Sequence, residues 1–150
     1  MSSIPRFAAY AAAFEKAYES NDWSLVEPFF EEDAVYEVRD FPAPLGGVVR
    51  GRAAILAYFD RVLNGFDRKF GARAVELVEG PRESDGAVWL KGRAIYTTPG
   101  LPDLVFELEE TATFEGDRIR RLEDRYERAE IEKVLAWART HGAAIGIHFG

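Results

Sequence analysis

The hydrophobic periodicity of this chain changes about halfway along, and that change restricts the fold more than any other feature. In the first half, apolar residues recur at spacings of three and four, as on one side of an α-helix; residues 5–20 carry Phe7, Tyr10, Phe14 and Tyr18 in this way. In the second half, segments rich in β-branched and aromatic residues alternate with polar ones, as strands with one buried face do. Helices followed by a run of strands predict an α+β fold.

Helix boundaries follow from capping and breaking residues. Asn21 or Asp22 can cap a short second helix, and Pro28 within it is expected to bend or shorten it. Gly142 is expected to end the last helix. The expected helices are residues 5–20, 23–30, 55–66 and 129–141.

Strand boundaries follow from turn signals at residues 80–81, 84–86 and 99–100. Residues 118–127 fit either a strand or the start of a helix. A strand is preferred, because residues 115–117 form a good hairpin connection and the preceding strand needs a partner. Residues 41–50 hold two Pro and two Gly and are expected to form a loop. The expected strands are residues 33–39, 73–79, 87–98, 104–114 and 118–127.

Composition removes several classes of function. The chain has 26 acidic and 19 basic residues, a formal charge of −7 and no Cys, which argues against nucleic-acid binding, disulfides, zinc–thiolate sites and iron–sulfur clusters. No apolar run approaches the roughly 20 residues of a membrane helix, and the start lacks the apolar stretch of a signal peptide. We expect one cytoplasmic domain over residues 1–150 that binds an apolar or cationic small molecule, without metal, cofactor, nucleic acid or membrane.

Two acidic residues fall on apolar faces of the expected strands. Glu110 lies between Leu108 and Ala112 in the alternation of its strand, and Asp124 follows Leu122 on one face of the last strand. Two carboxylates that face one pocket raise the pKa of at least one of them and supply an acid and a base together. Glu110 and Asp124 are therefore candidate catalytic residues.

The register of the last hairpin decides how close the two carboxylates come. A three-residue connection pairs Glu110 with Leu122 and leaves Asp124 as a diagonal neighbour, at roughly 7–8 Å. A shift by one residue places Glu110 and Asp124 directly opposite each other, at roughly 5 Å. The alternative interpretation is a structural ion-pair network in which Arg120 or Arg93 neutralises the carboxylates.

Four segments carry a family resemblance: the polar turn at residues 18–23, a Phe-acid-strand pattern at residues 29–36, Gly-Arg-Ala-Ala-Ile at residues 51–55 and Gly-Asp-Arg-Ile at residues 116–119. With this layout the chain resembles the nuclear transport factor two-like superfamily, also called SnoaL-like, from about Phe7 to about Tyr126. The resemblance implies a cone: a curved antiparallel sheet wrapped around the N-terminal helices, with an apolar pocket between them. Isomerases, dehydratases, epoxide hydrolases, polyketide cyclases and binding modules share this scaffold, so it does not fix a reaction.

Two enzyme types of the superfamily fit poorly. A ketosteroid isomerase-like mechanism uses a Tyr, a carboxylate base and a carboxylic acid where this chain has Phe14, Val38 and Glu110. Phe cannot donate a hydrogen bond and Val cannot accept a proton, so two of three roles are lost. A dehydratase-like His–Asp pair also fails, because His141 and His148 lie in the C-terminal tail.

A limonene epoxide hydrolase-like mechanism fits in part. Such enzymes hold a water with a Tyr and an Asn and activate it with an Asp; Tyr36 and Asp124 match, whereas Val38 stands at the Asn position. Gly92 and Ala94 stand where the related enzyme has an Arg and an Asp. Two of five positions match, which supports kinship rather than the same reaction.

These residues predict a small-molecule enzyme of hydrolase, isomerase or cyclase type that acts on an apolar substrate. Asp124 would be the general base, Tyr36 would position water or substrate, and Glu110 would be the acid. The alternative is a non-catalytic module that binds a hydrophobic ligand or a partner protein. The expected lining of the pocket is Phe14, Tyr18, Val38, Phe59, Gly92, Ala94, Tyr96, Leu108, Ala112 and Leu122.

The resemblance also implies a homodimer through the outer face of the sheet. Acidic and basic residues alternate there, which suits a symmetric polar interface in which Arg of one subunit meets Glu of the other. A monomer is the alternative, since a solvated sheet face shows the same alternation. The residues expected on this face are Glu107, Glu109, Thr111, Thr113, Arg121, Glu123 and Arg125.

Overall fold

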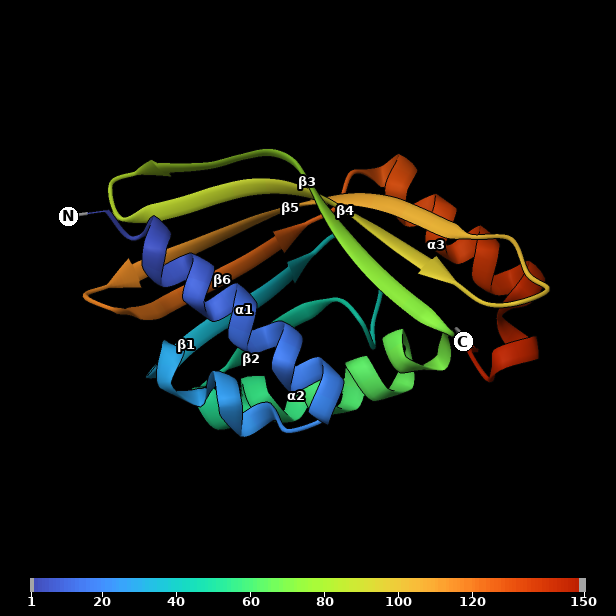
Figure 1. Ribbon diagram of the computed structural model, residues 1–150, viewed down its shortest axis with the longest axis horizontal. Helices are drawn as coiled ribbons and strands as arrows, with labels where there is room; N and C mark the ends of the chain where they lie inside the picture. The colour runs from blue at the N-terminus through green and yellow to red at the C-terminus, as the bar shows by residue number, and fades with distance from the viewer. Residues whose placement is uncertain (1, 149–150) are drawn as a thin grey trace.

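The computed structural model describes residues 2–148 and shows a curved sheet with two long helices along its inner face (Figure 1). Helices α1 (Ile4–Ser20) and α2 (Arg52–Gly65) are joined through the short 3-10 helix η1 (Trp23–Phe29) and the strands β1 (Phe30–Arg39) and β2 (Gly47–Arg50). Helix α3 (Arg128–His141) packs near the other end of the sheet, where it contacts β5 (Leu104–Glu115). The α+β class and the four expected helices are therefore confirmed, although the segment with Pro28 is a 3-10 helix.

The sheet has six strands in the order β2-β1-β6-β5-β4-β3. Every neighbouring pair is antiparallel except β1 and β6, which run parallel. The expectation of a purely antiparallel sheet is wrong at this one pair: the meander from β3 to β6 brings its last strand beside β1 in the same direction. The strands are β1 (Phe30–Arg39), β2 (Gly47–Arg50), β3 (Ala72–Ser84), β4 (Ala87–Thr97), β5 (Leu104–Glu115) and β6 (Arg118–Arg125).

The expected loop at residues 41–50 contains strand β2 at its end. Val49 pairs with Tyr36 of β1, and the pairing runs antiparallel from Val35 to Val38. The Pro and Gly residues form the tight reversal before the strand, so the prediction of a loop is correct only for the first part of the segment.

The expected turn at Gly80-Pro81 is wrong as well, because β3 continues through it to Ser84. The register with β4 shifts between Glu79 and Arg82, and Gly80 has a positive φ of 93°. An edge strand tolerates Pro and Gly because one side of its backbone has no partner strand, and a bulge absorbs the irregularity.

The last helix ends at His141 with Gly142 as its C-cap, as expected, but Gly142 does not adopt the left-handed conformation usual for such a glycine. Its φ is −60°, and the chain continues as the 3-10 helix η3 (Gly142–Ile145). Gly146, with a φ of 79°, is the left-handed residue that closes this segment. The predicted end of the α-helix is therefore confirmed, and a short 3-10 helix follows it.

The main core lies between α1, α2 and the concave face of the sheet. Phe14 of α1 packs edge-on against Phe59 of α2, with ring centroids 5.3 Å apart. Phe30, Leu122 and other strand residues beneath them are almost fully buried. The aromatic packing holds the helices over the sheet without filling all the space between them. In residues 2–148, no helix is both long and apolar enough to cross a membrane.

Candidate functional site

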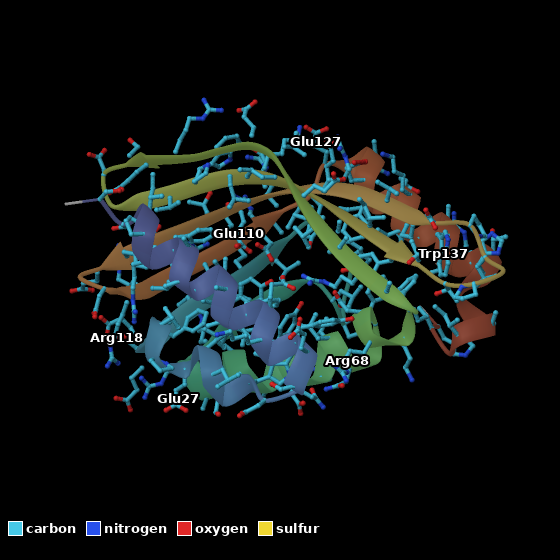
Figure 2. The ribbon with its side chains drawn as sticks, in the orientation of Figure 1. Glu27, Arg68, Glu110, Arg118, Glu127 and Trp137 are labelled. Atoms are coloured by element: carbon cyan, nitrogen blue, oxygen red, sulfur yellow. The ribbon has the colours of Figure 1, made fainter. Side chains whose placement is uncertain are left out.

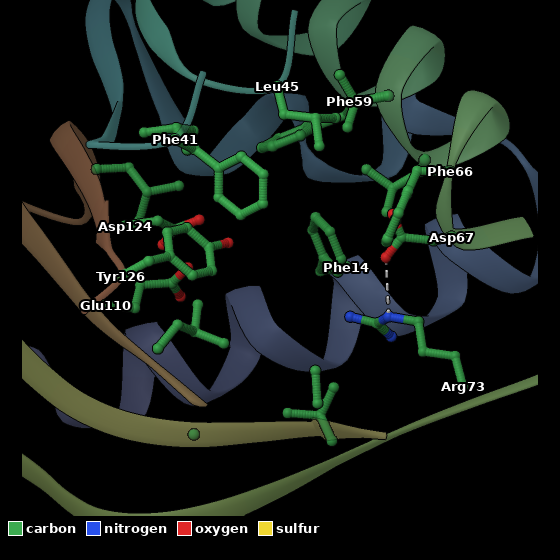
Figure 3. A pocket seen from close by; sticks show the side chains of 18 of the residues that line it. Phe14, Phe41, Leu45, Phe59, Phe66, Asp67, Arg73, Glu110, Asp124 and Tyr126 are labelled. Atoms are coloured by element: carbon green, nitrogen blue, oxygen red, sulfur yellow. Dashed lines mark ion pairs between the residues drawn. The ribbon is translucent and has the colours of Figure 1, made fainter. Parts of the chain in front are cut away.

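A cavity of about 270 Å³ lies between the helices and the concave face of the sheet (Figure 3). Most of its lining is aromatic or aliphatic. Polar side chains gather in two places, with Glu110 and Asp124 on one side of the cavity and Asp67 and Arg73 across from them, beyond Phe14. An apolar cavity with a few convergent polar groups is the usual form of a small-molecule site.

The last hairpin places the two carboxylates opposite each other. Glu110 of β5 pairs directly with Asp124 of β6, the closer of the two expected registers. The connection has two residues rather than three, since Glu115 pairs with Arg118, and the register then shifts at Arg120. With a two-residue connection alone, even-numbered residues of β5 would pair with odd-numbered residues of β6. The bulge shifts the register by one residue, so that Glu110 pairs with Asp124.

The same bulge removes the nearest candidate cation. It turns Ile119 into the core, with no exposed surface, and leaves Arg120 exposed, the reverse of the alternation expected for this strand. Arg93 also lies on the outer face, where it is paired with Glu107 at 2.9 Å. Neutralisation of the carboxylates by Arg120 or Arg93 is therefore wrong.

Asp124 is held by a tyrosine of the neighbouring strand. The hydroxyl of Tyr36 donates a hydrogen bond of 2.5 Å to Asp124 Oδ2, and each of the two residues is only 6% exposed. Asp124 Oδ1 is buried and, when Glu110 is ionised, has no hydrogen-bond donor among residues 2–148. Glu110, labelled in Figure 2 between the sheet and α1, lies directly opposite. The unpaired Oδ1 is therefore available to a proton from Glu110 or from a ligand.

Burial separates the acid strengths of the two carboxyl groups. It raises the pKa of Glu110 well above its usual range, and the neighbouring Asp124 raises it further. Burial also raises the pKa of Asp124, but hydrogen bonding with Glu110 and Tyr36 lowers it again. Asp124 therefore ionises first and Glu110 keeps its proton, although Glu110 still touches the cavity. This is the division of roles expected of a base and an acid in one site.

Tyrosine hydroxyl groups complete this end of the cavity. Tyr10, Tyr58 and Tyr126 line it together with Tyr36. Burial raises the pKa of each of them, and the charge of Asp124 raises it further. These hydroxyls therefore stay protonated. That of Tyr36 donates to Asp124, whereas that of Tyr58 donates to the carbonyl oxygen of Leu45.

A different arrangement surrounds Asp67, at the start of the 3-10 helix η2 (Asp67–Lys69). The hydroxyl of Tyr96 donates a 2.5 Å hydrogen bond to Asp67 Oδ2, and Arg73 Nε lies 3.4 Å from the same oxygen. Burial raises the pKa of Asp67 to about 6, against the lowering effects of Tyr96 and Arg73. Arg73 Nη1 also donates to Glu15 of α1 at 2.9 and 3.1 Å. This cluster ties η2, β3 and α1 together.

The structure brings most of the expected site residues to the cavity. Two expected residues do not line it: Ala112 is fully buried where β4, β5 and β6 pair, and Tyr18 lies behind Asp67, with its hydroxyl 3.3 Å from the Asp67 carbonyl oxygen. The expected residues that line the cavity are Tyr36, Glu110, Asp124, Phe14, Val38, Phe59, Gly92, Ala94, Tyr96, Leu108 and Leu122.

Asp67 and Arg73 line the cavity although the sequence did not indicate them. Asp67 lies in a short charged segment between two glycines, and Arg73 begins an edge strand. The one indication in the sequence is that Arg73 and Val75 are two residues apart in a strand. Such residues share a face, and here both lie on the inner side of β3.

The two histidines lie away from the cavity. Among residues 2–148, no group of three or more His, Asp or Glu side chains is arranged to hold a metal ion. His141 is at the end of α3, beside the ring of Trp137, and neither His141 nor His148 lines the cavity.

The fold and cavity define a class of small cone-shaped domains, and the family follows from the sequence. A model of the SnoaL-like domain matches residues 10–122, so the chain belongs to the SnoaL-like family. No curated protein matches the sequence. Family membership confirms the expected superfamily and leaves the reaction open.

Solved structures show the same fold at low sequence identity. A putative isomerase from Bacillus subtilis is 14% identical, with a TM-score of 0.67 over 91% of this chain and 97% of that one. An NTF2-like protein of unknown function from Burkholderia pseudomallei is 19% identical, with a TM-score of 0.66 over 87% and 95% of the two chains. An LEH-like epoxide hydrolase from M. tuberculosis is 18% identical, with a TM-score of 0.62 over 91% and 93%. At these identities the likeness is one of fold.

Proposed function

We propose that this protein is an enzyme that acts on a neutral, mainly apolar small molecule by carboxylate acid–base chemistry. The observation that carries the proposal is the pair of the half-buried Glu110 and the buried Asp124, directly opposite each other on paired strands. Tyr36 orients one oxygen of Asp124, and the other oxygen has no donor in residues 2–148 when Glu110 is ionised. A buried carboxylate pair without a neighbouring cation is costly to a fold, and such groups concentrate at functional sites.

The proposed roles follow from the two acid strengths. Asp124 Oδ1 takes a proton from a substrate C–H bond or from a water molecule, while Tyr36 holds Oδ2 in place. Glu110 gives its proton to the substrate oxygen that gains negative charge. The reaction leaves Asp124 protonated and Glu110 ionised, and transfer of the proton between them restores the starting state. This chemistry suits a hydrolase, an isomerase or a cyclase.

The wall formed by Gly92 and Ala94 supports a bulky apolar substrate. Both residues line the cavity, at the positions where the related hydrolase carries an Arg and an Asp. A Cβ on Gly92 would lie 3.9 Å from side-chain atoms of Leu90 and Val75, so the absence of a side chain leaves room at this wall.

The test is turnover of a panel of epoxide, enone and polyketide-like substrates by the wild type and Asp124→Asn. We expect loss of about 10²–10⁴-fold in rate for the variant, the usual contribution of a general base. Asp85→Asn, in the exposed β3–β4 turn, is the matched control and should retain full activity. Equal inertness of wild type and Asp124→Asn across the panel would count against the enzyme.

A non-catalytic binding module is the second candidate. It is favoured by the apolar residues Phe14 and Val38, which line the cavity. An isomerase of this superfamily needs a hydrogen-bond donor and a base at these two positions. A ligand that raises the melting temperature and is recovered unchanged supports this candidate. Native mass spectrometry of the purified protein tests it by detecting a hydrophobic molecule carried through purification.

For the assembly we propose a two-fold dimer through the outer face of the sheet. The outer residues Glu107, Glu123 and Arg121 are half-buried and already joined to Arg93, Glu37 and other side chains of the same face. Exposed ion pairs are screened at high salt, where the Debye length is roughly 3 Å in 1 M salt. Light scattering at low and high salt should show a dimer that weakens with salt; a mass near 16.9 kDa in both would exclude it.

A further inference from the structure

The cavity opens between α1 and β3. Three residues of its described lining are exposed: Ala11 and Glu15 on α1, and Val75 on β3, which is 51% exposed. Asp124 at the other side is only 6% exposed. A ligand that enters between α1 and β3 therefore passes Arg73 before it reaches the carboxylate pair.

Arg73 keeps at least one unused hydrogen-bond donor beside this opening. Its side chain is 10% exposed and projects into the space beside Phe14, as Figure 3 shows. Nη1 donates to both oxygens of Glu15, and Nε lies near Asp67. Nη2 carries two further donors. The hydroxyl of Tyr96, which hydrogen-bonds with Arg73 as well as with Asp67, accepts at most one of them, so at least one Nη2 donor is left over by the contacts found in residues 2–148. Tyr18 fixes the group further, with its ring centre 4.9 Å from the guanidinium carbon.

The charges around Arg73 select the kind of group that it can receive. Asp67 and Glu15 already place two carboxylates against one guanidinium, and Asp124 ionises at the other side of the cavity. An added anion would meet this excess negative charge, and a cation would be repelled by the guanidinium and has no acceptor for its N–H groups. A neutral oxygen acceptor avoids that repulsion and still gains a charge-assisted hydrogen bond from Nη2.

We infer that Arg73 is a positioning residue that binds a carbonyl oxygen of the substrate near the opening. The substrate class is then a neutral apolar ketone, ester or similar carbonyl compound, whose reacting atom extends past Phe14 to Asp124. The orientation of the substrate rests on the proposed acid–base function. The carbonyl subsite itself is a binding property and does not depend on turnover.

Four probes of similar size test the subsite by calorimetry or NMR titration: propiophenone, propylbenzene, 3-phenylpropanoate and 3-phenylpropylammonium. We expect the wild type to bind propiophenone about 10-fold more tightly than propylbenzene, as for one hydrogen bond to a charged donor, and to bind both ions more weakly. Arg73→Lys keeps the charge beside Asp67 but loses the planar fork, and should reduce the ketone preference to about 2-fold. Arg93→Lys, on the outer face of β4, is the matched control and should keep it.

A second measurement does not depend on a variant. Propiophenone should shift the guanidinium ¹⁵N resonances of Arg73 in the wild type, and propylbenzene should shift them much less. An unchanged ketone preference in Arg73→Lys, unshifted Arg73 resonances, or tightest binding of either ion overturns the proposal, as does a failure of propiophenone to bind at millimolar concentration. Asp124→Asn should keep the ketone preference; retention of this preference by a protein that turns nothing over would reject the enzyme and support the subsite.

Discussion

One cavity holds two buried carboxylate clusters that are built in opposite ways. At the opening, Asp67 accepts a hydrogen bond from Tyr96 and lies 3.4 Å from the Arg73 guanidinium. At the far side, Asp124 accepts an equally short bond from Tyr36, but it faces Glu110 rather than a cation. Both Asp side chains are less than one tenth exposed.

The comparison shows how the Arg73 guanidinium changes the energetic cost of a buried carboxylate. Desolvation penalises both carboxylates, and an ion pair offsets that penalty at Asp67. At Asp124 the penalty is offset only by hydroxyl groups and by a proton held on Glu110, so this pair stays ready to exchange protons. We therefore expect the first cluster to hold the fold together and position a ligand, and the second to perform chemistry at some cost in stability.

The largest expected effect comes from removal of the cation. Arg73→Gln leaves Asp67 buried without its ion-pair partner, which typically lowers the free energy of unfolding by about 3–5 kcal/mol. Urea denaturation at pH 7 measures the change. The double variant Asp67→Asn/Arg73→Gln removes both charges and should recover most of the loss. A loss below about 1 kcal/mol in Arg73→Gln would mean that the ion pair does not stabilise this end.

The pH dependence of stability gives the next effect. Asp67 has a pKa of about 6 in the fold and near 3.9 when unfolded, so the folded chain holds this proton more tightly. Its contribution is complete below pH 4 and is lost as the pH rises through 6. Between pH 4 and 7, the free energy of unfolding of the wild type should fall by about 2–3 kcal/mol more than that of Asp67→Asn.

Glu110→Gln provides the comparison between the two ends. Glu110 has its pKa raised well above the usual range, so its contribution has the same sign and is lost as the pH rises through that raised pKa. Denaturation curves between pH 4 and 8 measure both. Identical pH profiles for Asp67→Asn and Glu110→Gln would show that Arg73 makes no difference between the clusters.

A smaller effect, of opposite sign to Arg73→Gln, is expected at the far side of the cavity. Asp124→Asn removes a charge that lacks a cation, while the new amide oxygen can still accept from Tyr36. Replacement of such buried charges is often neutral or stabilising, and we expect the free energy of unfolding to rise by about 1–2 kcal/mol at pH 7. Thermal denaturation beside the Asp85→Asn control measures it. A clear destabilisation would place Asp124 among the structural residues.

The two clusters also differ in how far sequence reasoning could reach them. Alternation placed Glu110 and Asp124 on the inner face because β5, and β6 beyond its bulge, alternate regularly between buried and more exposed residues. The choice between diagonal and direct pairing depended on the bulge at Arg120, and no local residue preference marks that bulge. Asp67 and Arg73 meet only because a 3-10 turn and an edge strand approach each other in the fold, and periodicity carries no information about such an approach.

The smallest expected effect comes from the same substitution, Tyr to Phe, made once in each cluster. Tyr36→Phe and Tyr96→Phe each remove a hydroxyl that donates a 2.5 Å hydrogen bond to a buried Asp, and each should lower the free energy of unfolding by about 1 kcal/mol. Each donor stabilises the ionised carboxylate, so its loss raises the pKa of that Asp. Only Tyr36→Phe should move the acidic limb of the rate profile to higher pH, because Asp124 is the proposed base. ¹³C NMR titration of the Asp carboxyl groups assigns each shift, and an equal displacement of the rate profile by Tyr96→Phe would make Asp67 part of the catalytic machinery.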